Sequence, residues 1–163
     1  AEGATKIYQA KQRSPDKALP ILLGNVNQIP LVALNLSDSA LKLAERFLPG
    51  ALTLVVPKHP DIPDEVSSLE TVGIRIPDHE FTRALLNATG PLAVTSANVS
   101  GQRSPVDAGD VYLQLNGSLP LILDGGRTQG GLSSTVVDCT QDKIVILREG
   151  PISLQEIQTV LKN

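Results

Sequence analysis

Apolar residues recur along this chain with two periods, one typical of helices and one typical of strands. The helical period predicts five helices, because apolar side chains recur every three to four residues between capping and breaking residues. These segments are residues 4–11, 37–48, 79–88, 107–115 and 153–161. The last is the best signalled, since Ser153 and Glu156 form a capping box.

Short apolar runs and alternating patterns predict strands between these helices. The segments are residues 19–23, 51–56, 72–76, 92–95, 119–124, 135–139 and 143–148. In the third, apolar residues share one face, which leaves Gly73 and Arg75 on the other. Strands that alternate with helices over short connections predict a single α/β domain on a mixed, twisted sheet, whose ligands tend to bind beyond the strand ends.

Composition narrows the class of protein. The 163 residues and 17.2 kDa fit one domain, and 41% hydrophobic residues are enough for a core. Only 2% of residues are aromatic, which argues against base stacking on aromatic platforms, and the net charge of −3 argues against a general polycation. The single Cys139, the absence of an 18-residue apolar run and the absence of a signal-peptide pattern predict a cytoplasmic protein with no membrane partner.

The first candidate for chemistry is a basic cluster at the end of the first predicted helix. Lys11, Gln12 and Arg13 are followed closely by Lys17. Cations at a junction between helix and loop could bind phosphates. The same residues would equally serve as a solvated helix end whose charge complements the helix dipole.

Two further candidates are polar loops that follow predicted strands. Residues 95–101, Thr-Ser-Ala-Asn-Val-Ser-Gly, could hold an anion or a nucleotide, or form an ordinary Ser/Asn turn. The spacing Gly-x-Ser-x-Gly is missing, so Ser96 is not assigned as a hydrolase nucleophile. Residues 124–135 form a glycine-rich loop that could approach a ligand or be a flexible connection. It is no Walker A loop, since Leu132 and Ser133 stand where Lys-Ser/Thr is needed.

Two arginines lie in or at the end of predicted strands. The guanidinium groups of Arg75 and Arg148 suit a carboxylate or a phosphate, although a structural ion pair or an edge position would also explain each. A metal held by the protein is disfavoured, because His59 and His79 are far apart and Cys139 has no spaced partner.

Seven short motifs occur in one order along nearly the whole chain. They are Lys-x-Arg-x-Pro-x-x-x-Leu at 11–19, Phe-x-Pro-Gly-x-Leu-Thr-Leu-Val at 47–55, Val-Gly-Ile-Arg-Ile-Pro-Asp-His at 72–79, Thr-Ser-Ala-Asn-x-Ser-Gly at 95–101, Leu-Asp-Gly-Gly at 123–126, Ser-Thr-Val-Val-Asp at 134–138 and Leu-Arg-Glu-Gly at 147–150. In this order they resemble the YrdC domain family, the threonylcarbamoyl-AMP synthases. The resemblance implies an open sheet with flanking helices and a concave cleft.

The resemblance also implies a nucleotidyltransferase reaction. Threonine's amine and bicarbonate give a carbamate, which attacks the α-phosphorus of ATP and expels pyrophosphate. By the family pattern, Lys11 and Arg13 bind the ATP phosphates, Ser96 and Asn98 hold the nucleotide, Ser134 and Arg148 close the site, and Arg75 with Thr95 anchors the threonine carboxylate. Lys11, Arg13 and Arg75 are the expected catalytic residues, and Mg²⁺ is expected to arrive on the nucleotide rather than on protein ligands.

Expected partners are L-threonine, bicarbonate, ATP, tRNA or double-stranded RNA, and the proteins of later tRNA modification steps. The alternatives are a YrdC-like relative that binds structured RNA or a nucleotide without this synthesis, and an unrelated α/β protein.

The sequence departs from the family pattern in three places. No Pro-Thr-x-Thr-x-Tyr-Gly-Leu strand-turn segment precedes the first helix, so residues 1–163 are expected to form a YrdC-like domain that lacks one wall of the threonine pocket. Leu22 stands where many relatives carry a His that faces threonine, and Ser14 replaces an Arg before proline. Leu22 and Ser14 leave open whether the substrate is threonine, as in the family, or another molecule.

Overall fold

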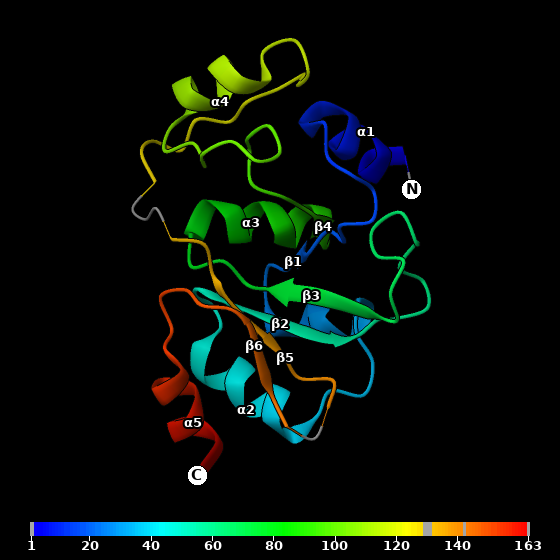
Figure 1. Ribbon diagram of the computed structural model, residues 1–163, viewed down its shortest axis with the longest axis vertical. Helices are drawn as coiled ribbons and strands as arrows, with labels where there is room; N and C mark the ends of the chain where they lie inside the picture. The colour runs from blue at the N-terminus through cyan, green and yellow to red at the C-terminus, as the bar shows by residue number, and fades with distance from the viewer. Residues whose placement is uncertain (1, 129–131, 142, 163) are drawn as a thin grey trace.

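A six-stranded mixed sheet organises the computed structural model, which describes residues 2–128, 132–141 and 143–162 (Figure 1). The strands are β1 (Ile21–Leu22), β2 (Leu52–Pro57), β3 (Thr71–Arg75), β4 (Leu92–Ala93), β5 (Thr135–Asp138) and β6 (Val145–Arg148). Their order across the sheet is β4-β1-β3-β2-β5-β6. β1 with β3 and β2 with β5 are parallel, and the other neighbours are antiparallel. The predicted mixed α/β sheet is confirmed.

Five α-helices and one short 3₁₀ helix surround the sheet in the described residues. They are α1 (Glu2–Lys11), η1 (Val26–Leu31), α2 (Asp38–Phe47), α3 (Glu80–Thr89), α4 (Ala108–Leu115) and α5 (Leu154–Lys162). Figure 1 shows α2 and α5 on one side of the sheet and α1, α3 and α4 on the other. All five predicted helices are present, whereas η1 was not predicted. No helix in the described part of the chain is long and apolar enough to cross a membrane.

The two faces of the central strands differ in chemistry. On one face Leu52, Leu54 and Ile74 are fully buried, as is Ile157 of α5. The opposite face of β2 and β3 carries Thr53, Val55, Gly73 and Arg75. The two-residue period predicted for residues 72–76 is thus confirmed, and it separates a hydrophobic core from a face that can hold a ligand.

The strand predicted for residues 119–124 is wrong. This segment is irregular, and Leu121 and Leu123 are 69% and 56% exposed. Alternating apolar residues favour a strand only where a neighbouring backbone can pair with them. The described sheet ends at β4 on one edge and at β6 on the other, and residues 119–124 pair with neither. β1 and β4 are also shorter than predicted, at two residues each.

Ser37 fixes the start of α2 through two hydrogen bonds. Its Oγ accepts a hydrogen bond from the backbone N of Ala40 at 3.2 Å and donates one to the carbonyl O of Cys139 at 3.1 Å. We expect Ser37→Ala to lower the free energy of unfolding by about 1–2 kcal/mol, because a helix cap and a contact to the end of β5 are both lost. Urea denaturation measures this loss. Ser39 lies two residues further along, inside α2, and Ser39→Ala should change the free energy of unfolding by less than about 0.5 kcal/mol. Equal losses in the two variants would contradict the capping role.

Cys139 is a core residue, 2% exposed. Burial, with a smaller contribution from Asp138, raises the pKa of its thiol from 9.0 to about 12. We therefore expect iodoacetamide to alkylate Cys139 roughly 1,000-fold more slowly in the folded protein than in the unfolded chain at pH 8, because the thiolate is the nucleophile. Mass spectrometry with and without urea measures the two rates. Comparable rates would contradict this burial.

The same pKa shift predicts how stability changes with pH. The unfolded thiol releases its proton near pH 9, whereas the folded thiol keeps it until about pH 12. The contribution of Cys139 to stability is therefore complete below about pH 9 and is lost between these two values.

Candidate functional site

A cavity of about 530 Å³ lies over the polar face of the sheet. Its lining comes from the strands β1, β2, β3, β5 and β6 and from the segments beside β1, β4 and β5. The lining residues are Arg13, Ala18, Leu19, Pro20, Leu22, Thr53, Val55, Gly73, Arg75, Val94, Thr95, Ser96, Ser133, Ser134, Val136 and Arg148. Three arginines and five hydroxyl residues share this lining with aliphatic side chains, and among the described residues no carboxylate lines the cavity. The cavity is suited to an anionic ligand.

The position of the cavity differs from the sequence expectation. Ligands were expected beyond the strand ends, but the cavity covers alternate residues of neighbouring strands, such as Thr53 and Val55 of β2 and Gly73 and Arg75 of β3. The face that α2 and α5 cover contains the apolar residues of these strands, so the opposite face remains open for a site.

Arg75 lies in the centre of the sheet, on β3. Its Nε donates a hydrogen bond to the carbonyl O of Gly50 at 2.9 Å. In the described part of the chain it forms no ion pair, and β3 is an interior strand, so neither alternative explanation of Arg75 applies. Burial, and then the nearby charge of Arg148, lower the pKa of Arg75 below its ordinary value. A half-buried cation beside a second cation is stabilised by an anionic ligand.

Gly50 supports this arrangement because no larger residue fits its place. A Cβ there would lie 2.4 Å from the carbonyl O of Phe47. The backbone N of Gly50 donates to the carbonyl O of Ile76 at 2.9 Å. The Pro49-Gly50 step that ends α2 thus holds the acceptor of Arg75.

Arg148 reaches the cavity from the edge strand β6. Its Nε and Nη2 donate to the carbonyl O of Ser134 at 3.0 and 2.8 Å, and Nη2 also lies 3.2 Å from Ser134 Oγ. Arg148 thus lies on an edge strand, which was one of the alternatives that the sequence left open for this residue. These bonds fix the guanidinium beside the hydroxyl of Ser134.

Arg13 lines the cavity from the loop after α1. Its Nη2 donates to the carbonyl oxygens of Lys17 and Ala18 at 3.2 and 3.1 Å. Lys17 is exposed and does not line the cavity. Ser14 does not line it either and contacts Asp16 at the surface. Of the predicted basic cluster, only the Arg13 side chain faces the site.

Lys11 and Asn98 lie behind the cavity rather than in its lining. Lys11 is 3% exposed, and its Nζ donates to the carbonyl oxygens of Ser96 and Asn98 and, at 3.4 Å, to Asn98 Oδ1. The backbone N of Ser100 donates to the carbonyl O of Lys11 at 2.9 Å. Burial, and then Arg13, lower the pKa of Lys11.

The loop of residues 95–101 is consequently more than a surface turn. It is fastened to the end of α1 through Lys11, and Asn98 Nδ2 donates to the carbonyl oxygens of Val99 and Gln102 at 2.9 and 2.8 Å. This anchoring presents Thr95 and Ser96 to the cavity.

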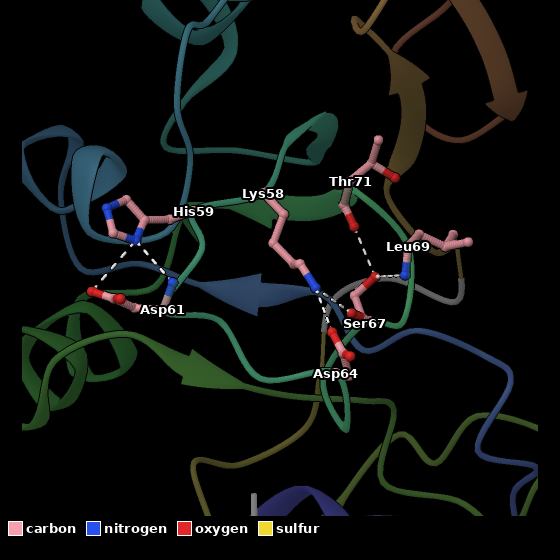
Figure 2. Close-up of polar contacts among 7 residues, drawn as sticks. All are labelled: Lys58, His59, Asp61, Asp64, Ser67, Leu69 and Thr71. Carbon is pink, nitrogen blue, oxygen red and sulfur yellow. Dashed lines mark hydrogen bonds and ion pairs between the residues drawn. The ribbon is translucent and has the colours of Figure 1, made fainter.

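The connection between β2 and β3 supports the cavity at Leu19, and Figure 2 shows the polar contacts within this connection. The Lys58 side chain is 8% exposed, and its Nζ donates to Asp64 Oδ1 at 2.9 Å and to the carbonyl O of Ser67 at 2.7 Å. This holds the loop so that the carbonyl O of Val66 accepts a hydrogen bond from the backbone N of Leu19 at 2.8 Å. Of residues 57–63, only Pro60 and Asp61 are exposed, and Ile62 packs against the core.

Among its described residues, the glycine-rich loop contributes only its end to the cavity. Residues 129–131, including Gly130 and Gly131, lie outside the described residues. Before them, the backbone N of Thr128 donates to the carbonyl O of Val106 at 2.8 Å, away from the lining. Ser133 and Ser134, after them, line the cavity.

Sequence reasoning missed Thr53 and Gly73 as cavity residues. Both face the cavity because of the same two-residue period that places Arg75 there. A single polar residue within the apolar run of residues 51–56 was the available signal for Thr53.

A family model covering the Sua5, YciO and YrdC proteins, described as "Telomere recombination", matches residues 1–150. The chain belongs to the Sua5/YciO/YrdC family. The threonylcarbamoyl-AMP synthases of Bacillus subtilis and Pyrococcus abyssi are each 40% identical to it, over 98% of this chain and over 47% and 48% of their own lengths. The chain thus spans about half the length of these curated relatives.

Solved structures of Sua5/YciO/YrdC proteins share the fold. The crystal structure of Pyrococcus abyssi Sua5 complexed with L-threonine has a TM-score of 0.94 and 38% identity, and the match covers 98% of this chain and 48% of that one. Escherichia coli YciO has a TM-score of 0.84 over 96% of this chain and 77% of that chain; its 23% identity shows the fold alone.

The donor set of this Sua5/YciO/YrdC cavity does not fit a metal ion held by the protein. No carboxylate or imidazole lines it, and the described residues contain no group of three His, Cys, Asp or Glu side chains that could hold a metal. Hydroxyls and guanidiniums suit oxyanions instead.

Proposed function

We propose that this chain makes threonylcarbamoyl-AMP from L-threonine, bicarbonate and ATP, as a nucleotidyltransferase serving the modification of tRNA. The observation that carries the proposal is the convergence of Arg13, Arg75 and Arg148 on one cavity without a lining carboxylate. Each of the three substrates carries an anionic group, the carboxylate of threonine, bicarbonate itself or the phosphates of ATP, and such a cavity suits these groups. The identity to two synthases supports the same reaction.

The proposed reaction needs no nucleophile from the protein. The amine of threonine condenses with bicarbonate to a carbamate and water. A carbamate oxygen then attacks the α-phosphorus of ATP, the bond between the α-phosphorus and the bridging oxygen breaks, and pyrophosphate leaves. Catalysis then rests on positioning the reactants and on stabilising negative charge.

We assign the threonine carboxylate to Arg75 and Thr95. Arg75 is fixed through Nε, which leaves its two Nη groups for a carboxylate. Leu22 lines the same cavity and gives it an aliphatic wall rather than an imidazole. This apolar wall suits the methyl group of threonine.

We assign the phosphates and the nucleotide to Arg13, Ser96, Ser134 and Arg148, which also line the cavity. Lys11 and Asn98 would act on the nucleotide through the loop that carries Ser96, because their side chains are bonded to that loop. Mg²⁺ would come with the phosphates of ATP. A cytoplasmic location and use of the product on tRNA by later modification proteins complete the proposal.

Isotope labelling tests the reaction by its product. The protein would be incubated with ATP, L-threonine and ¹³C-bicarbonate, and the nucleotides separated and weighed by mass spectrometry. The proposal expects threonylcarbamoyl-AMP that carries the label in its carbamoyl carbon. AMP or ADP as the only nucleotide product would contradict it.

A further inference from the structure

Two hydroxyl groups form a pair at the floor of the cavity. Thr53 Oγ1 of β2 lies 2.7 Å from Ser134 Oγ, which stands directly before β5. The two residues are 7% and 5% exposed, yet both line the cavity. Polar side chains this well enclosed have at least one hydrogen-bond partner, and here each hydroxyl is a partner of the other.

The hydrogens of this pair can be counted. Arg148 Nη2 donates to Ser134 Oγ at 3.2 Å, so Ser134 Oγ acts as an acceptor there. The two hydroxyls have two hydrogens between them, and one is used in the bond that joins them. Within residues 2–128, 132–141 and 143–162, neither hydroxyl donates to any other acceptor. One hydrogen of the pair is therefore left for a ligand in the cavity.

Glycines on both sides leave room for this pair and fix its position. A Cβ at Gly73 would lie 3.3 Å from Thr53 Cγ2, so the glycine keeps the space over Thr53 open. A Cβ at Gly150 would lie 2.4 Å from the backbone N of Thr135 and 2.5 Å from the carbonyl O of Ser133. Only glycine allows this close contact, which holds the backbone around Ser134.

The surrounding charge determines which ligand group suits the free hydrogen. Arg75 and Arg148 both line this cavity, and no lining carboxylate offsets them. A hydroxyl hydrogen near two guanidinium groups is turned toward negative charge. The matching acceptor is an oxyanion.

We infer that the hydroxyl pair of Thr53 and Ser134 donates its remaining hydrogen bond to an oxyanion of the substrate, which makes Thr53 a further residue of the binding site. The inference rests on the proposed function for the choice of oxyanion, which is either the carboxylate of threonine or a phosphate of ATP. It extends the set of predicted site residues, since Thr53 had no role among them.

Calorimetric titration distinguishes the two sources. Sodium pyrophosphate and L-threonine would be titrated separately into the wild-type chain and into Thr53→Val, which replaces the hydroxyl with a methyl group of similar size. We expect the affinity for one of these ligands to fall roughly 10- to 100-fold, as for loss of a hydrogen bond to a charged group. The ligand affected identifies the oxyanion.

Two variants separate ligand binding from folding. Thr53→Ser keeps the hydroxyl and should bind within about twofold of the wild type, and Thr71→Val makes the same exchange on β3 outside the cavity lining. Unchanged affinity of Thr53→Val for both ligands, or equal losses in Thr53→Val and Thr53→Ser, would overturn the inference. Hydroxyl-dependent binding without synthesis of threonylcarbamoyl-AMP would sustain it while refuting the proposed function.

Discussion

Arg75→Ala is expected to weaken the binding of L-threonine roughly 100-fold or more, because it removes the guanidinium assigned to the carboxylate. Threonine-dependent synthesis should fall at least as much. The fold should remain, since the substitution also removes a half-buried cation that repels Arg148. Calorimetric titration with threonine measures the affinity, and thermal denaturation should give a midpoint within about 4 °C of the wild type.

Matched arginine variants give this experiment its controls. Arg83→Ala removes a guanidinium of α3 that pairs with Asp78 at 3.0 Å and does not line the cavity. It should bind threonine like the wild type. Arg75→Lys keeps the charge but not the paired donors, so its affinity should lie between those of the wild type and Arg75→Ala. Wild-type affinity in folded Arg75→Ala would refute the assignment.

Lys11→Met is expected to lower both stability and activity. It removes the ammonium group that bonds the loop of residues 95–101, leaving the carbonyl oxygens of Ser96 and Asn98 without that donor. We expect a loss of about 2–4 kcal/mol in the free energy of unfolding, by the cost of unpaired buried acceptors. A displaced loop should also lower the rate of synthesis by about 100-fold.

Lys6 provides the matched control, since it lies on the same helix. Its ammonium group pairs with Glu2 at 2.7 Å, and the two side chains are 70% and 83% exposed. Lys6→Met should change the free energy of unfolding by less than about 1 kcal/mol. Urea denaturation measures the free energy of unfolding of both variants. Similar losses in Lys11→Met and Lys6→Met would refute the anchoring role of Lys11.

Local patterns predicted most of the fold because each local signal agreed with the tertiary packing. The capping box is present as predicted, with Ser153 N donating to Glu156 Oε2 at 2.8 Å. His79, predicted as a helix-start residue, accepts a hydrogen bond from the backbone N of Thr82 at 3.3 Å. The failure at residues 119–124 arose because strand formation depends on a partner that the segment's own pattern does not specify.

The site was predictable as a set of residue types but not as a geometry. Alternation in β3 separated Arg75 from the core, and the structure brings it together with Arg13, Thr95 and Ser96 in one cavity. The Lys11 side chain is buried because it contacts Ser96 and Asn98, which lie 85 and 87 residues further along the chain. Spacing along the chain has no information on such contacts.

Pyrophosphate release tests the proposed function most directly. The protein would be assayed with ATP, L-threonine and bicarbonate together, and with each one omitted in turn. Folded Arg75→Ala protein would be assayed in the same way as the negative control. The account predicts release only when all three substrates are present, and little release by Arg75→Ala. Release from ATP without threonine, or none from folded wild-type protein with all three, would contradict it.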